Sequence, residues 1–215
     1  MTKIAPSILA ADLSKINNEV INVDKAGAEY IHIDVMDGHY VPNISFGPNI
    51  VETLRPLTKK ILDVHLMITP VMPYIKAFID AGADIISFHP EADDNSKTII
   101  ETIKSANCKA GIAIHPNVEI EAIQEFLNDI DLVVVMTVVP GFGGQKFLDT
   151  QLPKINKLYN IRESTKANFE IEIDGGINPQ TSKQCIANGA DVLVAGSYIY
   201  GADESEYGNL INSLR

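Results

Sequence analysis

Short apolar runs rich in β-branched residues alternate with amphipathic stretches over the whole chain, and this alternation predicts an α/β fold. Eight such runs occur in 215 residues, at a spacing of about 27 residues. Eight strand–helix units of that size use up the chain without a linker or a low-complexity tract. The sequence therefore predicts a compact (β/α)8 TIM barrel with a single domain over residues 1–215.

The first expected strand runs from Ile4 to Leu9, and Asp12 is an expected N-cap for a helix that reaches Ala26. The other seven strands are recognised by β-branched residues between turn signals. They are expected at 30–35, 61–67, 84–88, 110–114, 132–138, 169–173 and 192–195. Helix-like segments are expected between them.

Three of the expected helices end in a similar tetrapeptide with Gly at its second position, at 26–29, 81–84 and 188–191. Glycine suits the residue after a helix, and each tetrapeptide leads into a strand. The glycines are 82 − 27 = 55 and 189 − 82 = 107 residues apart, which is two and four units. A doubly wound open sheet is the alternative, but it gathers its ligand groups around one switch point, whereas polar candidates here follow at least six strands.

Composition excludes several classes of function. A formal net charge of −11 argues against nucleic acid or an anionic membrane surface as a partner, because polyanions need a basic footprint. The apolar run at the N-terminus is too short for a signal peptide, and no run reaches the roughly 18 residues of a membrane span. Cys108 and Cys185 are expected to be free and reduced, and cytoplasmic residence is expected.

Four side chains at or near strand ends suit one divalent metal ion: His32, Asp34, His65 and Asp174. Residues i and i+2 of a strand share a face, so His32 and Asp34 can point together at a centre that the others reach from neighbouring strands. Two imidazoles and two carboxylates suit zinc, iron(II), cobalt or manganese. Each residue alone is better explained as a core histidine or a turn aspartate, but the four together favour metal binding.

Three glycine-containing loops follow the last three strands and predict a site for a phosphate group. They contain Gly141, Phe142, Gly143 and Gly144, then Gly175 and Gly176, and finally Gly196 and Ser197. Apart from Lys146 at the edge of the first loop, they carry no lysine or arginine, so a phosphate would be held by backbone amides and Ser197. The alternative is that these glycines only turn corners.

Three methionines, Met36, Met67 and Met136, fall on or just after strand ends. Methionine at such positions is more often core packing, but methionine around a site also gives a soft, water-poor wall for an electron-rich intermediate. Three further histidines follow strands two, four and five without a carboxylate partner on each. These are expected in loops or around the ligands, and not as ligands: His39, His89 and His115.

The ordered motifs of the chain resemble those of the ribulose-phosphate 3-epimerase family from end to end. They are Ala-Pro-Ser-Ile-Leu-Ala-Ala-Asp at 5–12, His-Ile-Asp-Val-Met-Asp-Gly-His-Tyr-Val-Pro-Asn at 32–43, Asp-Val-His-Leu-Met at 63–67, Pro-Gly-Phe-Gly-Gly-Gln at 140–145, Asp-Gly-Gly-Ile at 174–177 and Val-Ala-Gly-Ser at 194–197. The resemblance implies a metal-dependent isomerase of the pentose phosphate pathway that interconverts D-ribulose 5-phosphate and D-xylulose 5-phosphate. It also implies a homo-oligomer, either a dimer or a hexamer.

The resemblance assigns the four residues named above as metal ligands, with Asp34 as proton acceptor and Asp174 as proton donor. The substrate contacts that it implies are Ser7, His65, Gly141, Phe142, Gly143, Gly144, Asp174, Gly175, Gly176, Gly196 and Ser197. Inversion at C3, next to a ketone, needs one proton removed from one face and another delivered to the opposite face, so two acid/base groups suit this chemistry. A divalent metal would stabilise the 2,3-enediolate between the two steps.

Three positions depart from the family pattern without touching a proposed ligand: His115, Thr137 and Val139. The reaction type is therefore better supported than the sugar, and a 3-epimerase of allulose 6-phosphate, which shares Met-Thr-Val at 136–138, is the alternative. A decarboxylase similar to the orotidine-phosphate enzymes needs Asp-x-Lys-x-x-Asp on the third strand, where this chain has His65 and Ile68. A non-catalytic sugar-phosphate-binding barrel would be expected to lack a ligand or a base.

Overall fold

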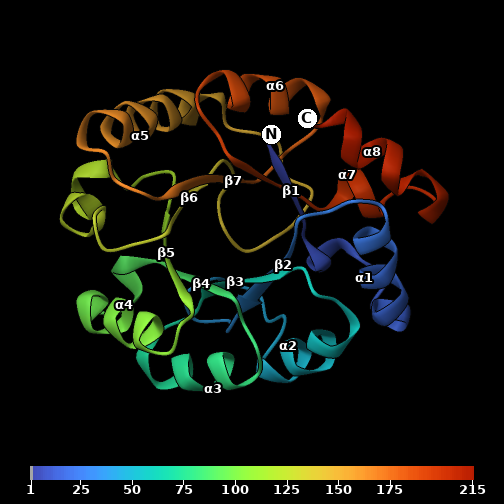
Figure 1. The fold of residues 1–215 in the computed structure, drawn as a ribbon, viewed down its shortest axis with the longest axis horizontal. Coiled ribbons are helices and arrows are strands. Elements are labelled where there is room, and N and C mark those ends of the chain that lie inside the picture. Colours follow the sequence, from blue (N-terminus) through green and yellow to red (C-terminus); the bar gives the residue numbers. More distant parts are fainter. Residues whose placement is uncertain (1) are drawn as a thin grey trace.

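Eight parallel strands form the barrel in the computed structural model, which describes residues 2–215 (Figure 1). The strands are β1 (Lys3–Pro6), β2 (Tyr30–Met36), β3 (Ile61–Met67), β4 (Ile85–Phe88), β5 (Lys109–Ile114), β6 (Leu132–Met136), β7 (Glu170–Asp174) and β8 (Val192–Ala195). Their order is β1-β8-β7-β6-β5-β4-β3-β2. A single bridge between Ser7 and His32 joins the two ends of this sheet, so the predicted TIM barrel is confirmed as a nearly closed ring.

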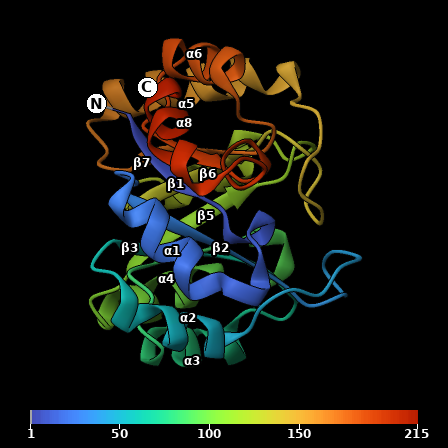
Figure 2. The same ribbon diagram turned by 90° about the vertical axis from the view of Figure 1, so that its right-hand side faces the viewer.

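Helices surround the ring of strands (Figures 1 and 2). They are α1 (Ile16–Lys25), α2 (Pro48–Leu54), α3 (Ile75–Asp80), α4 (Ser96–Ser105), α5 (Leu152–Thr165), α6 (Pro179–Ala187), α7 (Ser197–Tyr200) and α8 (Tyr207–Ser213). Between β5 and β6 the connection is a 3-10 helix, Ile120–Phe126, and not an α-helix. No described helix is long and apolar enough to cross a membrane.

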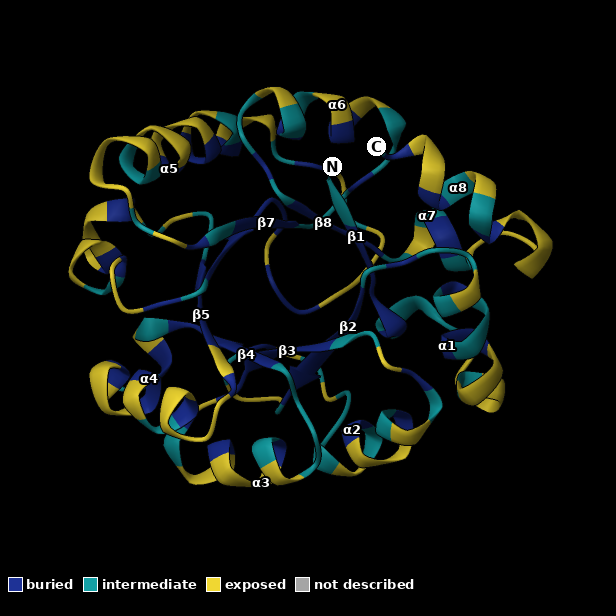
Figure 3. Ribbon diagram, viewed as in Figure 1, coloured by how far each residue is buried: buried dark blue, intermediate teal, exposed yellow. Residues whose placement is uncertain are grey.

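Alternation along each strand divides the core into two layers. Outward positions such as Ile31, Ile33 and Val35 of β2 belong to the large cluster between strands and helices. Inward positions of other strands, such as Val134 and Val194, form a smaller cluster inside the ring. Figure 3 shows the strands as a nearly continuous buried ring with exposed residues on the outer helix faces. The inward layer is where the polar candidates lie, because they share its period of two.

The ends of several elements differ from the prediction. β1 stops at Pro6 because the Ser7 side chain caps a 3-10 turn by accepting a hydrogen bond from the Leu9 amide. Asp12 is an N-cap as predicted, but of a 3-10 turn, and α1 begins only at Ile16. β7 extends one residue further than predicted, so Asp174 is its last residue. The two cysteines are free and buried, and the three helix-end glycines have positive φ.

Candidate active site

The register of the sheet brings the four predicted metal ligands together. Asp34 of β2 lies opposite His65 of β3, and Asp174 ends β7. The His65 Nδ1 atom is 3.4 Å from Asp34 Oδ1 and 3.5 Å from Asp174 Oδ2. The His32 Nε2 atom is 3.3 Å from Asp34 Oδ1 and 3.9 Å from Asp174 Oδ2. One atom from each of the four residues therefore lies within 4.8 Å of the others.

These separations fit a four-coordinate divalent ion. Bonds of about 2.1 Å in tetrahedral geometry place ligand atoms roughly 3.4 Å apart. The His32 Nε2 and His65 Nδ1 atoms are buried and have no hydrogen-bond partner among residues 2–215. A buried nitrogen without a partner is costly unless a ligand satisfies it. The donor set and the missing partners both fit a metal ion.

A buried carboxylate orients His32. The His32 Nδ1 atom is 2.6 Å from Asp63 Oδ2 and 3.6 Å from Glu172 Oε1, and all three side chains are fully buried. This contact leaves Nε2 of His32 as the free lone pair on the side of the candidate centre, the usual arrangement behind a metal-bound histidine. Burial, and next the charge of Asp63, raise the pKa of Glu172 well above its usual range. This environment therefore favours the neutral form of Glu172.

Sequence reasoning did not single out Asp63 and Glu172, although a signal for them was present. Each stands two residues before a predicted ligand, Asp63 before His65 and Glu172 before Asp174. The period of two that paired His32 with Asp34 also places these residues on the inner face. Together with His32 they form a second buried group of His and carboxylate side chains.

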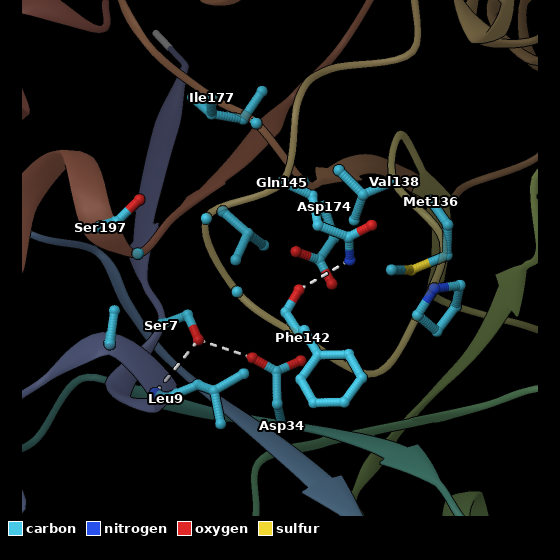
Figure 4. A pocket seen from close by; sticks show the side chains of 18 of the residues that line it. Ser7, Leu9, Asp34, Met136, Val138, Phe142, Gln145, Asp174, Ile177 and Ser197 are labelled. Carbon is cyan, nitrogen blue, oxygen red and sulfur yellow. Dashed lines mark hydrogen bonds between the residues drawn. The ribbon is translucent and has the colours of Figure 1, made fainter. Parts of the chain in front are cut away.

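Ser7 holds the carboxylate of Asp34. Its hydroxyl donates a 2.6 Å hydrogen bond to Asp34 Oδ2, which leaves Oδ1 on the side of the two histidines (Figure 4). Burial alone would raise the pKa of Asp34, but the close approach of the His32 and His65 imidazoles holds this pKa well below its usual range. Asp34 is therefore an ionised carboxylate at the floor of the site.

A cavity of about 610 Å³ opens above these carboxylates. Its walls include Met36, Met67 and Met136, all at most 3% exposed, so the predicted methionine positions do surround the site. His32 and His65 are fully buried below the floor and are not among the residues that line the cavity. Figure 4 shows the Asp34 and Asp174 side chains reaching the cavity from different strands, with Met136 beside them.

All three glycine-containing loops line the same cavity. The lining includes Gly141, Phe142, Gly143 and Gly144 from the first, Gly175 and Gly176 from the second, and Gly196 and Ser197 from the third. None of the described lining residues is a lysine or an arginine. An anion in this part of the cavity would therefore be bound by amides, with Ser197 at the start of α7.

Tertiary hydrogen bonds fix the second of these loops. Thr137 donates from its hydroxyl to the carbonyl of Gly175 at 2.6 Å, and its amide bonds to the carbonyl of Asp174. The strand β6 ends at Met136, just before Thr137, and not at residue 138 as predicted. A Cβ atom on Gly176, whose φ is +67°, would lie 2.6 Å from the Phe147 amide nitrogen. Only glycine fits there.

Two loops meet at the mouth of the cavity. Asn43 in the loop after β2 donates a 2.8 Å hydrogen bond to the carbonyl of Gly141 in the loop after β6. Figure 2 shows both loops projecting from the same end of the barrel. Gln145 closes the second loop by donating to the carbonyls of Val139 and Phe142, and both of those side chains are 55% exposed. The exposed side chains of Val139 and Phe142 therefore lie on a loop that the hydrogen bonds of Gln145 hold in place.

The three remaining histidines lie at different distances from the centre. His89 is fully buried, and its Nε2 atom is 3.0 Å from Nε2 of His65. His115 is half-buried and accepts a hydrogen bond from the amide of Asn117. His39 is exposed in the loop after β2. None of the three is in the four-residue group around the candidate centre.

A family model described as the ribulose-phosphate 3 epimerase family matches residues 3–200. The ribulose-phosphate 3-epimerase of Bacillus subtilis (strain 168) is 49% identical over 216 residues, covering 100% of this chain and 99% of the relative. That of Rhodobacter capsulatus is 45% identical, covering 99% and 94%. The chloroplastic ribulose-5-phosphate-3-epimerase of Arabidopsis thaliana is 42% identical, covering 99% of this chain and 75% of the relative.

Among solved structures, KGPDC from Streptococcus mutans matches with a TM-score of 0.74, at 17% identity, and covers 100% of this chain and 95% of that one. The 3-keto-L-gulonate-6-phosphate decarboxylase of Vibrio cholerae matches with a TM-score of 0.73 at 20% identity, covering 100% and 95%. At these identities the likeness shows the barrel fold alone.

Proposed function

The chain belongs to the ribulose-phosphate 3-epimerase family, isomerases that act on carbohydrates, and from this premise we propose that it interconverts D-ribulose 5-phosphate and D-xylulose 5-phosphate at the cavity described above. The observation that carries the proposal is the pair of carboxylates, Asp34 and Asp174, that meet two partnerless imidazole nitrogens below that cavity. The glycine-containing loops supply the other half of a sugar-phosphate site on the same wall.

Asp34 removes the C3 proton from one face of the sugar, and Asp174 delivers a proton to the other face in the forward direction. The low pKa of Asp34 keeps this residue ionised and ready to accept. The hydroxyl of Ser7 donates to its Oδ2 atom and fixes the orientation of the carboxylate, while the Oδ1 atom faces the two histidines. The second carboxylate comes from β7, on a different part of the ring, as transfer to the opposite face of a planar enediolate requires.

His32, Asp34, His65 and Asp174 would hold one divalent ion, which we propose to be zinc, iron(II), manganese or cobalt. When bound, such an ion supplies Lewis-acid polarisation of the C2 carbonyl, worth several kcal/mol of stabilisation for the 2,3-enediolate. The methionine side chains exclude water around that charge, and this strengthens every electrostatic contact inside the site.

The phosphate of the substrate is proposed to bind the amides of Gly175, Gly176 and Gly196 together with Ser197, while the loop from Gly141 to Gly144 covers the sugar. Local amides can hold an anion on a chain whose net charge is −11, because the field of oriented N–H groups acts at short range. We further propose that residues 1–215 act as one catalytic domain, in a homo-oligomer, in the cytoplasm.

Proton exchange at C3, followed by NMR in deuterated water, tests the function directly. The metal-loaded protein is given ribulose 5-phosphate and, separately, allulose 6-phosphate. Deuterium incorporation with epimer formation on the pentose is the expected result. A preference for allulose 6-phosphate would identify this hexose phosphate as the substrate. Exchange on neither sugar would overturn the proposal.

Matched variants assign the roles. Asp34→Asn and Asp174→Asn each remove a proton-transfer group and are expected to lower kcat by about 10² to 10⁴. Asp94→Asn, a change of the same chemistry at an exposed position, is the control and should leave kcat unchanged. Near-native turnover of either active-site variant with normal metal content would remove that residue from the mechanism.

A further inference from the structure

We propose that His89 is a positioning residue for the metal ligand His65, held in place by Glu91 and Tyr40. The proposal rests on the proposed function, because it assigns a role toward the metal ion of that site. His89 follows β4, Glu91 lies in the same loop, and Tyr40 lies in the loop after β2. From the buried ligand the three residues lead outward, since His89 is buried, Tyr40 is half-buried and Glu91 is exposed.

The contact between the two histidines is direct. The Nε2 atom of His65 is 3.0 Å from the Nε2 atom of His89, the ring centroids are 5.1 Å apart, and both side chains are fully buried. The Nδ1 atom of His65 therefore faces the candidate centre, and its Nε2 atom faces His89. No other hydrogen bond reaches the ring nitrogens of His65 in the described residues.

Hydrogen-bond stoichiometry assigns the tautomers that a metal-bound state requires. A metal ion takes the lone pair of His65 Nδ1, so the proton of neutral His65 must be on Nε2. Nε2 then donates to His89 Nε2, which must be an unprotonated acceptor. The proton of His89 is consequently on its Nδ1 atom. By accepting the hydrogen bond from Nε2 of His65, the Nε2 atom of His89 thus favours the tautomer in which Nδ1 of His65 has its lone pair free for the metal ion.

The other side of His89 is arranged to receive that proton. The Nδ1 atom of His89 makes no hydrogen bond among the described residues, but it lies 3.7 Å from Glu91 Oε1, and the negative charge of that carboxylate would favour a proton on Nδ1. Tyr40 fixes this carboxylate by donating a 2.8 Å hydrogen bond to Glu91 Oε1. Tyr40 also lies over the ring of His89, with centroids 4.8 Å apart and planes tilted by 33°. The orientation of His89 is therefore determined from two sides.

His32 offers an internal comparison. Its second nitrogen meets the carboxylate of Asp63 at 2.6 Å, whereas the second nitrogen of His65 meets an imidazole. Partners behind a metal-bound histidine typically change metal affinity by 10-fold to 100-fold. A neutral acceptor adds no charge near the ion, so His65 keeps its orientation without a further carboxylate beside Asp34 and Asp174.

Cobalt(II) titration of the metal-free full-length protein tests the proposal, with the d–d absorption band as the readout of the ligand set. His89→Leu removes the acceptor and is expected to weaken cobalt(II) binding by about 10-fold to 100-fold and to shift the band. His89→Gln places an amide oxygen near the position of Nε2 and should restore most of the affinity. His115→Gln, a matched change at the end of the next strand, should leave affinity and band unchanged.

Two outcomes separate the proposal from the function on which it rests. If the wild-type protein binds cobalt(II) and His89→Leu binds it with the same affinity and spectrum, the positioning role is wrong while the metal site stands. If the wild-type protein binds no cobalt(II), the metal centre itself is wrong. Should His89→Leu fail to fold, Tyr40→Phe and Glu91→Gln decide, because both residues are less buried than His89. Unchanged binding in both variants overturns the proposal, and weakened binding supports it.

Discussion

The two ends of the barrel interior both gather charged side chains, but only one end leaves them without partners. At the end where the strands begin, Lys3 forms an ion pair with Glu170, and the Tyr30 hydroxyl donates to the same carboxylate at 2.6 Å. At the end where the strands finish, Nε2 of His32 and Nδ1 of His65 are buried without a partner. A cluster of charges indicates a ligand site when its bonding capacity is unmet, and a structural contact when it is satisfied.

Removal of the metal ion should have the largest effect of all, and only at the unsatisfied end. Treatment with a chelator is expected to lower kcat for C3 exchange by at least about a hundredfold, because several kcal/mol of polarisation are lost. Addition of cobalt(II) or manganese should restore exchange. The melting temperature should fall as well, since a ligand that binds only the folded state stabilises it. Full activity of the chelator-treated protein would show that the reaction does not depend on a metal ion.

The buried group of His32, Asp63 and Glu172 provides a sharper comparison, because its two carboxyl groups, Asp63 and Glu172, are equally buried. Asp63→Asn should weaken metal binding by about tenfold, because the charge that supports the Nδ1 proton of His32 is lost. Glu172→Gln should leave affinity close to that of the wild-type protein, because burial already keeps Glu172 neutral and glutamine has nearly the same shape. Metal titration with both variants is the measurement. Equal weakening in the two would mean that Glu172 carries charge toward His32.

The fold was predictable because its signals are local. Alternation of apolar residues is repeated in every unit, and each inward candidate could be assigned from a period of two, as with His32 and Asp34. The same reasoning applies to Asp63 and Glu172, which were overlooked only because their neighbours had more obvious chemistry. The four predicted ligands lie close together because strand ends meet at one end of a barrel.

Features that depend on contacts between distant segments were not predictable. Just beyond the end of β6, Thr137 donates a hydrogen bond to Gly175, a residue 38 positions away. The contact between His65 and His89 depends on the side-chain rotamers of residues on neighbouring strands, which no pattern in the sequence specifies. The start of α1 was displaced because the stretch after Asp12 first forms a 3-10 turn.

The smallest effect is expected at the satisfied end. Glu170→Gln removes the ion pair with Lys3 but keeps an acceptor for Tyr30, and the paired side chains are 34% and 29% exposed. Solvent screens such a pair, so the free energy of unfolding should fall by about 1 kcal/mol or less in urea titrations. The kcat for C3 exchange should not change, because every functional group lies at the other end of the ring. A double-mutant cycle with Lys3→Met isolates the ion pair. A loss of turnover with unchanged stability would show that the two ends are coupled through the inward layer, and the distinction between a satisfied and an unsatisfied cluster would then fail for this barrel.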